Sequence, residues 1–211
     1  MKTKYKLICF DMDGTIITNT NSVSFLCLLN NKIQEENEIN IKEENNEISW
    51  IQADYLKANL MKGLKISKIK DSFSYLNIIK GLDELISYIH SFNIKTMLIT
   101  AGPFQVANLI GEYYRFENCY GSYYEIIENE FTGNILNHIG PEGKLNILKD
   151  HCKLNNIELD EVISVGDNAS DIDIFQNTGL SIAINYSKTV EGKADYYINT
   201  DSIMDILKFI D

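Results

Sequence analysis

Two pairs of aspartates stand directly after short apolar segments of this 211-residue chain. Asp11 and Asp13 follow the first such segment, and Asp167 and Asp171 follow a segment much further along. Four carboxylates at one place repel one another unless a cation lies between them, and Mg²⁺ prefers carboxylate, water and phosphate oxygens as ligands. The aspartates therefore predict a magnesium site if the fold brings them together.

Groups that suit an anion lie between the two aspartate pairs. Thr100, Ala101 and Gly102 follow another apolar segment, and Lys144 lies in the first turn of a helix predicted to start at Pro141. A lysine, a hydroxyl and backbone N–H groups at a helix start can cradle phosphate. Together with a metal and an aspartate able to attack, this set predicts phosphoryl transfer through an aspartyl-phosphate.

The elements that must position these residues alternate along the chain. Short apolar runs predict buried strands at residues 5–10, 95–100, 162–165 and 180–184. Helical spacing of apolar residues lies between them, as in residues 82–89 and in the helix from Pro141, and a short helix is expected at 205–210. The alternation predicts an α/β fold with a Rossmann-like, doubly wound and mostly parallel sheet. In such sheets ligands bind outside the carboxyl ends of the strands.

Two segments interrupt the alternation. Residues 123–127 and 131–135 flank Glu128-Asn129-Glu130 and predict a hairpin. Residues 17–79 contain no convincing parallel strand, so we expect a small helical cap inserted after the first strand, with residues 1–16 and 80–211 as the catalytic core. Within this cap, residues 30–47 are rich in Asn and Glu, which favours a solvated helix or a mobile loop.

As a set, these motifs resemble those of the haloacid dehalogenase superfamily. The set consists of DMDGT at residues 11–15, Thr100, Lys144 and a GDxxxD pattern at residues 166–171. Order and spacing are most similar to the phosphoserine phosphatase-like branch, whose helical cap follows the first motif. The resemblance covers essentially the whole chain and implies a Mg²⁺-dependent phosphatase for a small phosphomonoester.

The resemblance also implies roles for the aspartates. Asp11 attacks phosphorus, and Asp13 protonates the leaving oxygen and then activates water. Asp11, the backbone carbonyl of Asp13 and Asp167 hold Mg²⁺. Asp171 supports the metal or the nearby lysine from outside the ligand set.

The phosphate oxygens are expected to meet a second group of residues. The resemblance assigns them to Thr100, to the N–H groups of Ala101 and Gly102, and to Lys144, which neutralises charge on the nucleophile and the phosphoryl group. Ser170 stands where phosphoserine enzymes usually carry Asn, and a hydrogen bond near the site is one of two interpretations for it.

The expected substrate-binding positions of the cap depart from the family pattern. Thr20 lies in a stretch without an acid where phosphoserine phosphatases place a Glu for the substrate amine. Lys57 lies where they use an arginine for the substrate carboxylate, and a lysine lacks the bidentate fork. Asp54 and Trp50 are candidates to face the site, with helix packing as the alternative for Trp50. The substrate is therefore expected to be phosphoserine or another small phosphorylated metabolite.

Composition excludes several classes of partner. The chain has 19 basic and 30 acidic residues, a formal charge of −11, and Arg115 as its single arginine, which argues against a nucleic-acid surface. No apolar run approaches the length of a membrane span. The four cysteines have no metal-ligand spacing and the N-terminal apolar stretch is too short for a signal peptide, so we expect reduced thiols and a cytoplasmic location.

Other functions remain open at this point. A phosphotransferase or mutase on the same scaffold would pass phosphate to an acceptor instead of water. A receiver-like signalling protein also uses Asp, Thr, Lys and Mg²⁺, but the cap, the late GDxxxD motif and Asp13 argue against it. A weakly catalytic binding protein is disfavoured because all four motifs are intact. Oligomeric state is not predicted.

Overall fold

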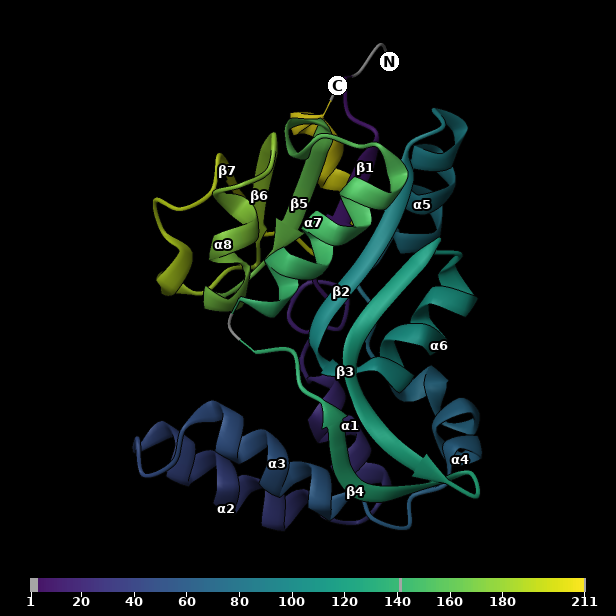
Figure 1. Ribbon diagram of the computed structural model, residues 1–211, viewed down its shortest axis with the longest axis vertical. Helices are drawn as coiled ribbons and strands as arrows, with labels where there is room; N and C mark the ends of the chain where they lie inside the picture. The colour runs from purple at the N-terminus through teal and green to yellow at the C-terminus, as the bar shows by residue number, and fades with distance from the viewer. Residues whose placement is uncertain (1–3, 141, 211) are drawn as a thin grey trace.

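In the computed structural model, which describes residues 4–140 and 142–210, seven strands form one sheet in the order β4-β3-β2-β1-β5-β6-β7 (Figure 1). Every neighbouring pair is parallel except β3 and β4. The predicted mostly parallel sheet is confirmed. The strands are β1 Leu7–Phe10, β2 Lys95–Pro103, β3 Asn118–Ile127, β4 Glu130–Asn137, β5 Val162–Gly166, β6 Leu180–Ile184 and β7 Tyr196–Ile198.

Several strand boundaries differ from the prediction. The second predicted strand, 95–100, continues to Pro103, because Pro103 still pairs with Ser122 of β3 after a register shift. The predicted hairpin is confirmed, but its strands are longer since β3 pairs with β2 along one part and with β4 along another. Strand β7 was not predicted.

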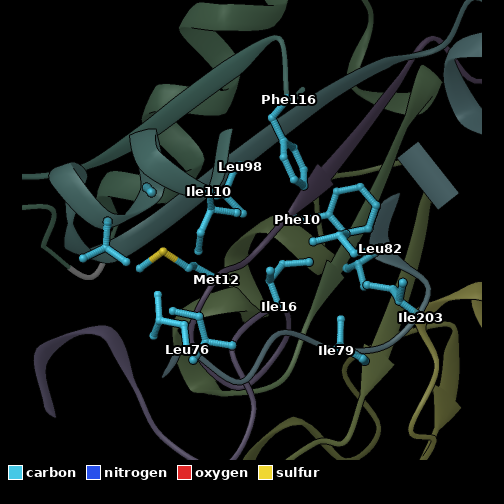
Figure 2. Close-up of a cluster of buried hydrophobic side chains, with 14 of the residues drawn as sticks. Phe10, Met12, Ile16, Leu76, Ile79, Leu82, Leu98, Ile110, Phe116 and Ile203 are labelled. Carbon is cyan, nitrogen blue, oxygen red and sulfur yellow. The ribbon is translucent and has the colours of Figure 1, made fainter. Parts of the chain in front are cut away.

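Helices cover both faces of the sheet, as a doubly wound fold requires. Side chains of β1 alternate: Ile8 and Phe10 belong to one buried cluster, and Leu7 and Cys9 to another. Figure 2 shows part of the first cluster. Helices α5 Leu82–Ser91 and α6 Phe104–Tyr114 contribute to the first cluster, and helices α7 Gly143–Asn155 and α8 Ile172–Phe175 to the second.

Two predicted helices have other boundaries. The predicted start of α7 at Pro141 lies outside the described residues, and the described helix begins at Gly143. The helix predicted at 205–210 is a 3₁₀ helix over Ile203–Phe209.

The segment between β1 and α5, which the sequence predicts to be a cap and which is called the cap below, is helical. It contains α1 Ser22–Leu29, α2 Ile33–Glu44, α3 Trp50–Leu60, α4 Ile66–Asp71 and a 3₁₀ turn Phe73–Tyr75. Figure 1 shows α2 and α3 beside β4, at the end of the molecule away from α5. The chain enters and leaves this part side by side: the Thr18 N–H donates to the Asn77 carbonyl at 2.7 Å, and the Ile79 N–H donates to the Ile16 carbonyl at 2.9 Å.

The Asn- and Glu-rich residues 30–47 are mainly the helix α2, one of the two structures expected for them. They are not solvated throughout, because Glu36 is buried and accepts a hydrogen bond from the Ser24 hydroxyl at 2.5 Å. A buried carboxylate on a helix this polar shows that packing against α1 decides its position.

Two further expectations concern the cysteines and the helices. All four cysteine thiols are free, and three of them are buried. Among the helices of residues 4–140 and 142–210, none combines the length and the apolar character needed to cross a membrane.

Candidate active site

The end of β1 carries the first two aspartates to the carboxyl edge of the sheet. The Asp11 N–H donates to the Val165 carbonyl of β5 at 2.9 Å, which extends the parallel pairing past Phe10. Met12 is fully buried in the cluster of Figure 2. Since side chains alternate along extended backbone, anchoring Met12 in the core leaves Asp11 and Asp13 to face the site.

Asp11 belongs to a buried polar cluster built by three elements. The Lys144 ammonium, from the first turn of α7, donates to Asp11 Oδ1, to the Ser170 hydroxyl at 2.8 Å and to Asp171 Oδ1 at 2.8 Å. Asp11, Lys144 and Asp171 are each at most 4% exposed. Residues predicted as nucleophile, lysine and supporting groups are thus brought together, including Ser170.

The charges of this cluster do not balance. Burial raises the pKa of Asp11 well above its ordinary value; Lys144 acts against that rise, and Asp171 and Asp167 add to it. Burial acts to lower the pKa of Lys144, but the adjacent Asp11 and Asp171 outweigh it and raise that pKa. One ammonium among three carboxylates leaves excess negative charge in a buried place.

A hard cation fits this excess charge. Carboxylate oxygens of Asp11, Asp167 and Asp171 all lie within 4.8 Å of one another. Asp11 Oδ2 is buried and has no hydrogen-bond partner among the residues that the structure describes. Burial raises the pKa of Asp167 to about 7, and Asp171 adds to the rise. These oxygens are the donor set that Mg²⁺ prefers.

Within this group, Asp171 bonds both to Lys144 and to the loop after β5. Its Oδ1 accepts from Lys144, and its Oδ2 accepts the N–H groups of Asp167 at 3.0 Å and Asn168 at 3.2 Å. With both oxygens engaged, Asp171 orients the loop after β5. Asp167 Oδ1 accepts the Asn168 side-chain amide at 2.9 Å, so among the described residues Asp11 Oδ2 and Asp167 Oδ2 are the oxygens left to face a cation.

The absence of a side chain at Gly14 leaves room for the Asp167 carboxylate. Gly14 has a φ of +88°, and a Cβ atom on it would lie 2.2 Å from Asp167 Oδ2. Any side chain here would meet both a strained backbone and a carboxylate. The glycine of the DMDGT motif thus allows the aspartates that follow β1 and β5 to approach each other.

The Asp13 side chain is bonded to the start of the first helix of the cap, α1. Its Oδ1 accepts the Ser22 N–H at 2.6 Å, and its Oδ2 accepts the Ser22 hydroxyl at 2.7 Å. Burial raises the pKa of Asp13, and the two bonds from Ser22 oppose that rise. Sequence reasoning did not identify Ser22, although Asn21-Ser22 has the composition of a helix N-terminus and Asn21 does cap α1.

The residues predicted to bind phosphate lie at the end of β2. Thr100 is buried, and its hydroxyl accepts the Gly102 N–H at 2.9 Å. That N–H is therefore already bonded, whereas the resemblance implies that it binds phosphate. A Cβ atom on Gly102 would lie 2.6 Å from the Ser22 hydroxyl oxygen and 2.8 Å from Asp13 Oδ2, so the backbone closes tightly around Asp13.

A cavity of about 660 Å³ separates these groups from the cap. Asp13, Ala101, Gly102, Lys144 and Ser170 line its core side. The cap side includes Glu43, Trp50, Asp54 and Lys57, of which the sequence did not single out Glu43.

The cap side chains of the cavity are paired. Lys57 Nζ lies 2.9 Å from Glu43 Oε2, and His138 Nε2 lies 2.9 Å from Asp54 Oδ2. The Trp50 and His138 ring centroids are 5.2 Å apart, so Trp50 both packs and lines the cavity.

Thr20, the remaining expected substrate residue, is exposed, and the cavity wall does not include it. A larger cavity of about 800 Å³ lies where the chain crosses between cap and core, with Thr18, Asn77 and Thr200 among its lining residues. Its wall includes none of the site aspartates found above.

Comparisons with known proteins identify chains of similar sequence and structure. A family model described as haloacid dehalogenase-like hydrolase matches residues 8–176. A phosphoserine phosphatase of Methanocaldococcus jannaschii is 25% identical over 211 residues, the full length of both chains. A structure described as a substrate-bound phosphoserine phosphatase complex superposes with a TM-score of 0.86 at 24% identity, covering all of both chains. Another, described as a phospho-aspartyl intermediate analogue of phosphoserine phosphatase, has a TM-score of 0.84 at 24% identity, covering 98% of this chain and 99% of the other.

Proposed function

We propose that this chain, which belongs to the haloacid dehalogenase-like hydrolases, hydrolyses a small phosphomonoester through a phosphorylated Asp11. The observation that supports the proposal most directly is how the two oxygens of the Asp11 carboxylate are bonded. Lys144 holds its Oδ1, while its buried Oδ2 has no hydrogen-bond partner in the described parts of the chain. A carboxylate that a lysine holds at one oxygen, and whose other oxygen can face a cation, is fixed in place and able to attack phosphorus.

In the first step, an Asp11 oxygen forms a bond to phosphorus and the bond from phosphorus to the ester oxygen breaks. Asp13 gives its proton to that leaving oxygen. Burial raises the pKa of Asp13, which favours the protonated form that this step needs. Ser22 holds the carboxyl in place at 2.6 and 2.7 Å.

In the second step, Asp13, now ionised, takes a proton from water while the water oxygen bonds to phosphorus. The bond between Asp11 and phosphorus breaks, which releases inorganic phosphate and restores the Asp11 carboxylate. Lys144 stays within bonding distance of Asp11 and balances negative charge there in both steps.

Asp11, the Asp13 carbonyl and Asp167 would hold Mg²⁺, with Asp171 as the residue that orients the loop. When bound, the ion would supply positive charge for the phosphoryl oxygens and for the crowded carboxylates. Thr100, Ala101 and Lys144 would meet the phosphate from the core side of the cavity.

The substrate is a small phosphorylated metabolite on this proposal. The relative from Methanocaldococcus jannaschii, a phosphoserine phosphatase, supports an amino-bearing phosphomonoester as the starting point. Four free thiols support a reducing, cytoplasmic location.

The test is hydrolysis of p-nitrophenyl phosphate, which needs little from the cap. The proposal expects release of phosphate that requires Mg²⁺ and is lost in Asp11→Asn. Equal activity of Asp11→Asn and the natural protein would overturn it. Phosphate found on an added alcohol instead of in solution would identify a phosphotransferase.

A further inference from the structure

The cap side of the 660 Å³ cavity has one lysine and two carboxylates. This excess of acidic side chains affects which substrate the cavity can bind. Lys57 Nζ lies 2.9 Å from Glu43 Oε2, and the Lys57 side chain is only 11% exposed. A substrate carboxylate seeking Lys57 would meet an ammonium group that already has an anionic partner. It would also leave Glu43 without its cation in a partly buried place, which is unfavourable.

The second carboxylate adds to this effect. Asp54 Oδ2 bonds to His138, whose ring packs against those of Trp50 and Tyr55 at centroid distances of 5.2 and 5.6 Å. The two rings fix His138, and His138 fixes Asp54 on the cavity wall. Asp54 therefore presents a fixed carboxylate to anything in the cavity.

Each cap carboxylate also keeps an oxygen for a ligand. Among the described residues, hydrogen bonds reach Glu43 through Oε2 and Asp54 through Oδ2, which leaves Glu43 Oε1 and Asp54 Oδ1. Trp50 lines the same wall, and an indole face attracts an ammonium group. Counting the whole lining, four carboxylates (Asp13, Glu43, Asp54, Asp173) stand against two lysines, one of which is bonded to Asp11 and Asp171.

We propose that the cap wall selects phosphomonoesters whose far end carries an ammonium group and no carboxylate, with Glu43 and Asp54 as the specificity-determining residues. The proposal rests on the phosphomonoesterase function above. It differs from a preference for phosphoserine, since the carboxylate of phosphoserine would have to displace Glu43 from Lys57.

The experiment compares kcat/KM, with Mg²⁺, for O-phosphoethanolamine, L-phosphoserine and 3-phosphoglycerate. These carry an amine alone, an amine with a carboxylate, and a carboxylate alone. Each value is divided by that for p-nitrophenyl phosphate, which reports the core chemistry. We expect phosphoethanolamine to exceed both others by about tenfold or more, the size of one charge-assisted contact.

Substitutions then assign the selectivity to residues. Glu43→Gln and Asp54→Asn are each expected to lower the ratio for phosphoethanolamine by about tenfold, since each loses the charge that meets the amine. Glu38→Gln, at an exposed position of α2 outside the cavity wall, is the matched control and keeps the ratio.

The outcomes separate the two proposals. Faster turnover of L-phosphoserine or 3-phosphoglycerate than of phosphoethanolamine by the natural protein overturns the selectivity. So does an unchanged ratio in both variants. Failure to turn over p-nitrophenyl phosphate overturns the proposed function itself. Because the comparison in the natural protein needs no variant, a variant that fails to fold leaves that test intact.

Discussion

Ser22 holds both carboxylate oxygens of Asp13, with its N–H 2.6 Å from Oδ1 and its hydroxyl oxygen 2.7 Å from Oδ2. Ser22 is fully buried at the start of the first cap helix, while Asp13 follows the first strand of the core. One residue thus connects the position of the cap to the proposed acid and base.

This contact predicts the effect of Ser22→Ala. Hydrogen bonds from Ser22 lower the pKa of Asp13 against the effect of burial, so loss of the hydroxyl raises that pKa. Asp13 must be ionised to activate water, so the acidic limb of the kcat profile with p-nitrophenyl phosphate moves to higher pH. On that limb kcat falls by about fivefold, the size of one net hydrogen bond.

The control for this prediction is Ser91→Ala. The Ser91 hydroxyl donates to the Tyr88 carbonyl at the exposed end of α5, away from the site. A profile for Ser22→Ala that overlies those of Ser91→Ala and the natural protein would show that the contact does not tune Asp13.

Lys144 predicts an effect on stability. Removing its ammonium in Lys144→Met leaves Asp11 and Asp171 buried without the cation between them. Loss of one partner from a buried ion pair costs about 3–5 kcal/mol. Urea unfolding of the metal-free protein should show that loss, and Mg²⁺ should restore part of it.

The matched variant is Lys149→Met, on the same helix at an exposed position. It is expected to change the free energy of unfolding by less than about 0.5 kcal/mol. Equal stabilities of the two variants would contradict a structural role for the Lys144 cluster.

Comparing Gly14 with Gly63 distinguishes backbone strain from crowding of the proposed metal site. Both have positive φ, +88° and +81°, but a Cβ atom on Gly14 meets Asp167 Oδ2 at 2.2 Å, and one on Gly63 meets nothing within 4 Å. Both Ala variants carry backbone strain of about 1 kcal/mol. Only Gly14→Ala should also raise the Mg²⁺ concentration for half-maximal activity, by about tenfold or more. Similar magnesium curves for both variants would contradict this account of Gly14.

Asp167 predicts a pH dependence of magnesium binding. Burial raises its pKa from 3.8 to about 7, so the metal-free native state holds a proton that the unfolded chain releases. Stability without metal is therefore lost as pH rises from about 4 to 7 through this group. Magnesium needs the ionised carboxylate, so the rise in melting temperature on adding Mg²⁺ should be larger at pH 8 than at pH 6.

The variant Asp167→Asn tests the source of that pH dependence. Its amide does not titrate, so the difference between pH 6 and pH 8 should shrink together with the magnesium effect. A magnesium effect that is the same at both pH values in the natural protein would show that Asp167 is not the responsible group.

That the core residues of the candidate site converge could be predicted from the sequence, because local pattern decides where they lie. Asp11 and Asp167 each follow a short apolar strand, and parallel neighbours bring the carboxyl ends of such strands to one edge. The position of Lys144 could likewise be predicted from the helix alone, because the residue lies in its first turn. Strand β2 extends to Pro103, and Thr100 still lies at that edge of the sheet. The pairing of this extension with β3 could not be predicted, because the two strands are separate in the sequence.

The cap was less predictable because contacts between distant segments decide it. Glu43 lies in an Asn- and Glu-rich segment whose composition favours solvent, yet packing of α2 against α3 brings it to Lys57, 14 residues further along. Thr20 has the right place in the motif order but is exposed. Ser22 has only the composition of a helix start, and nothing local indicates that Asp13 is its partner.

The most direct test of the account is to find where the phosphoryl group is during turnover. The protein is quenched in acid while it hydrolyses p-nitrophenyl phosphate with Mg²⁺, and its peptides are analysed by mass spectrometry. The account predicts a phosphoryl adduct on Asp11 that is absent from Asp11→Asn. Turnover without an adduct on Asp11, or with the adduct on another residue, would contradict it.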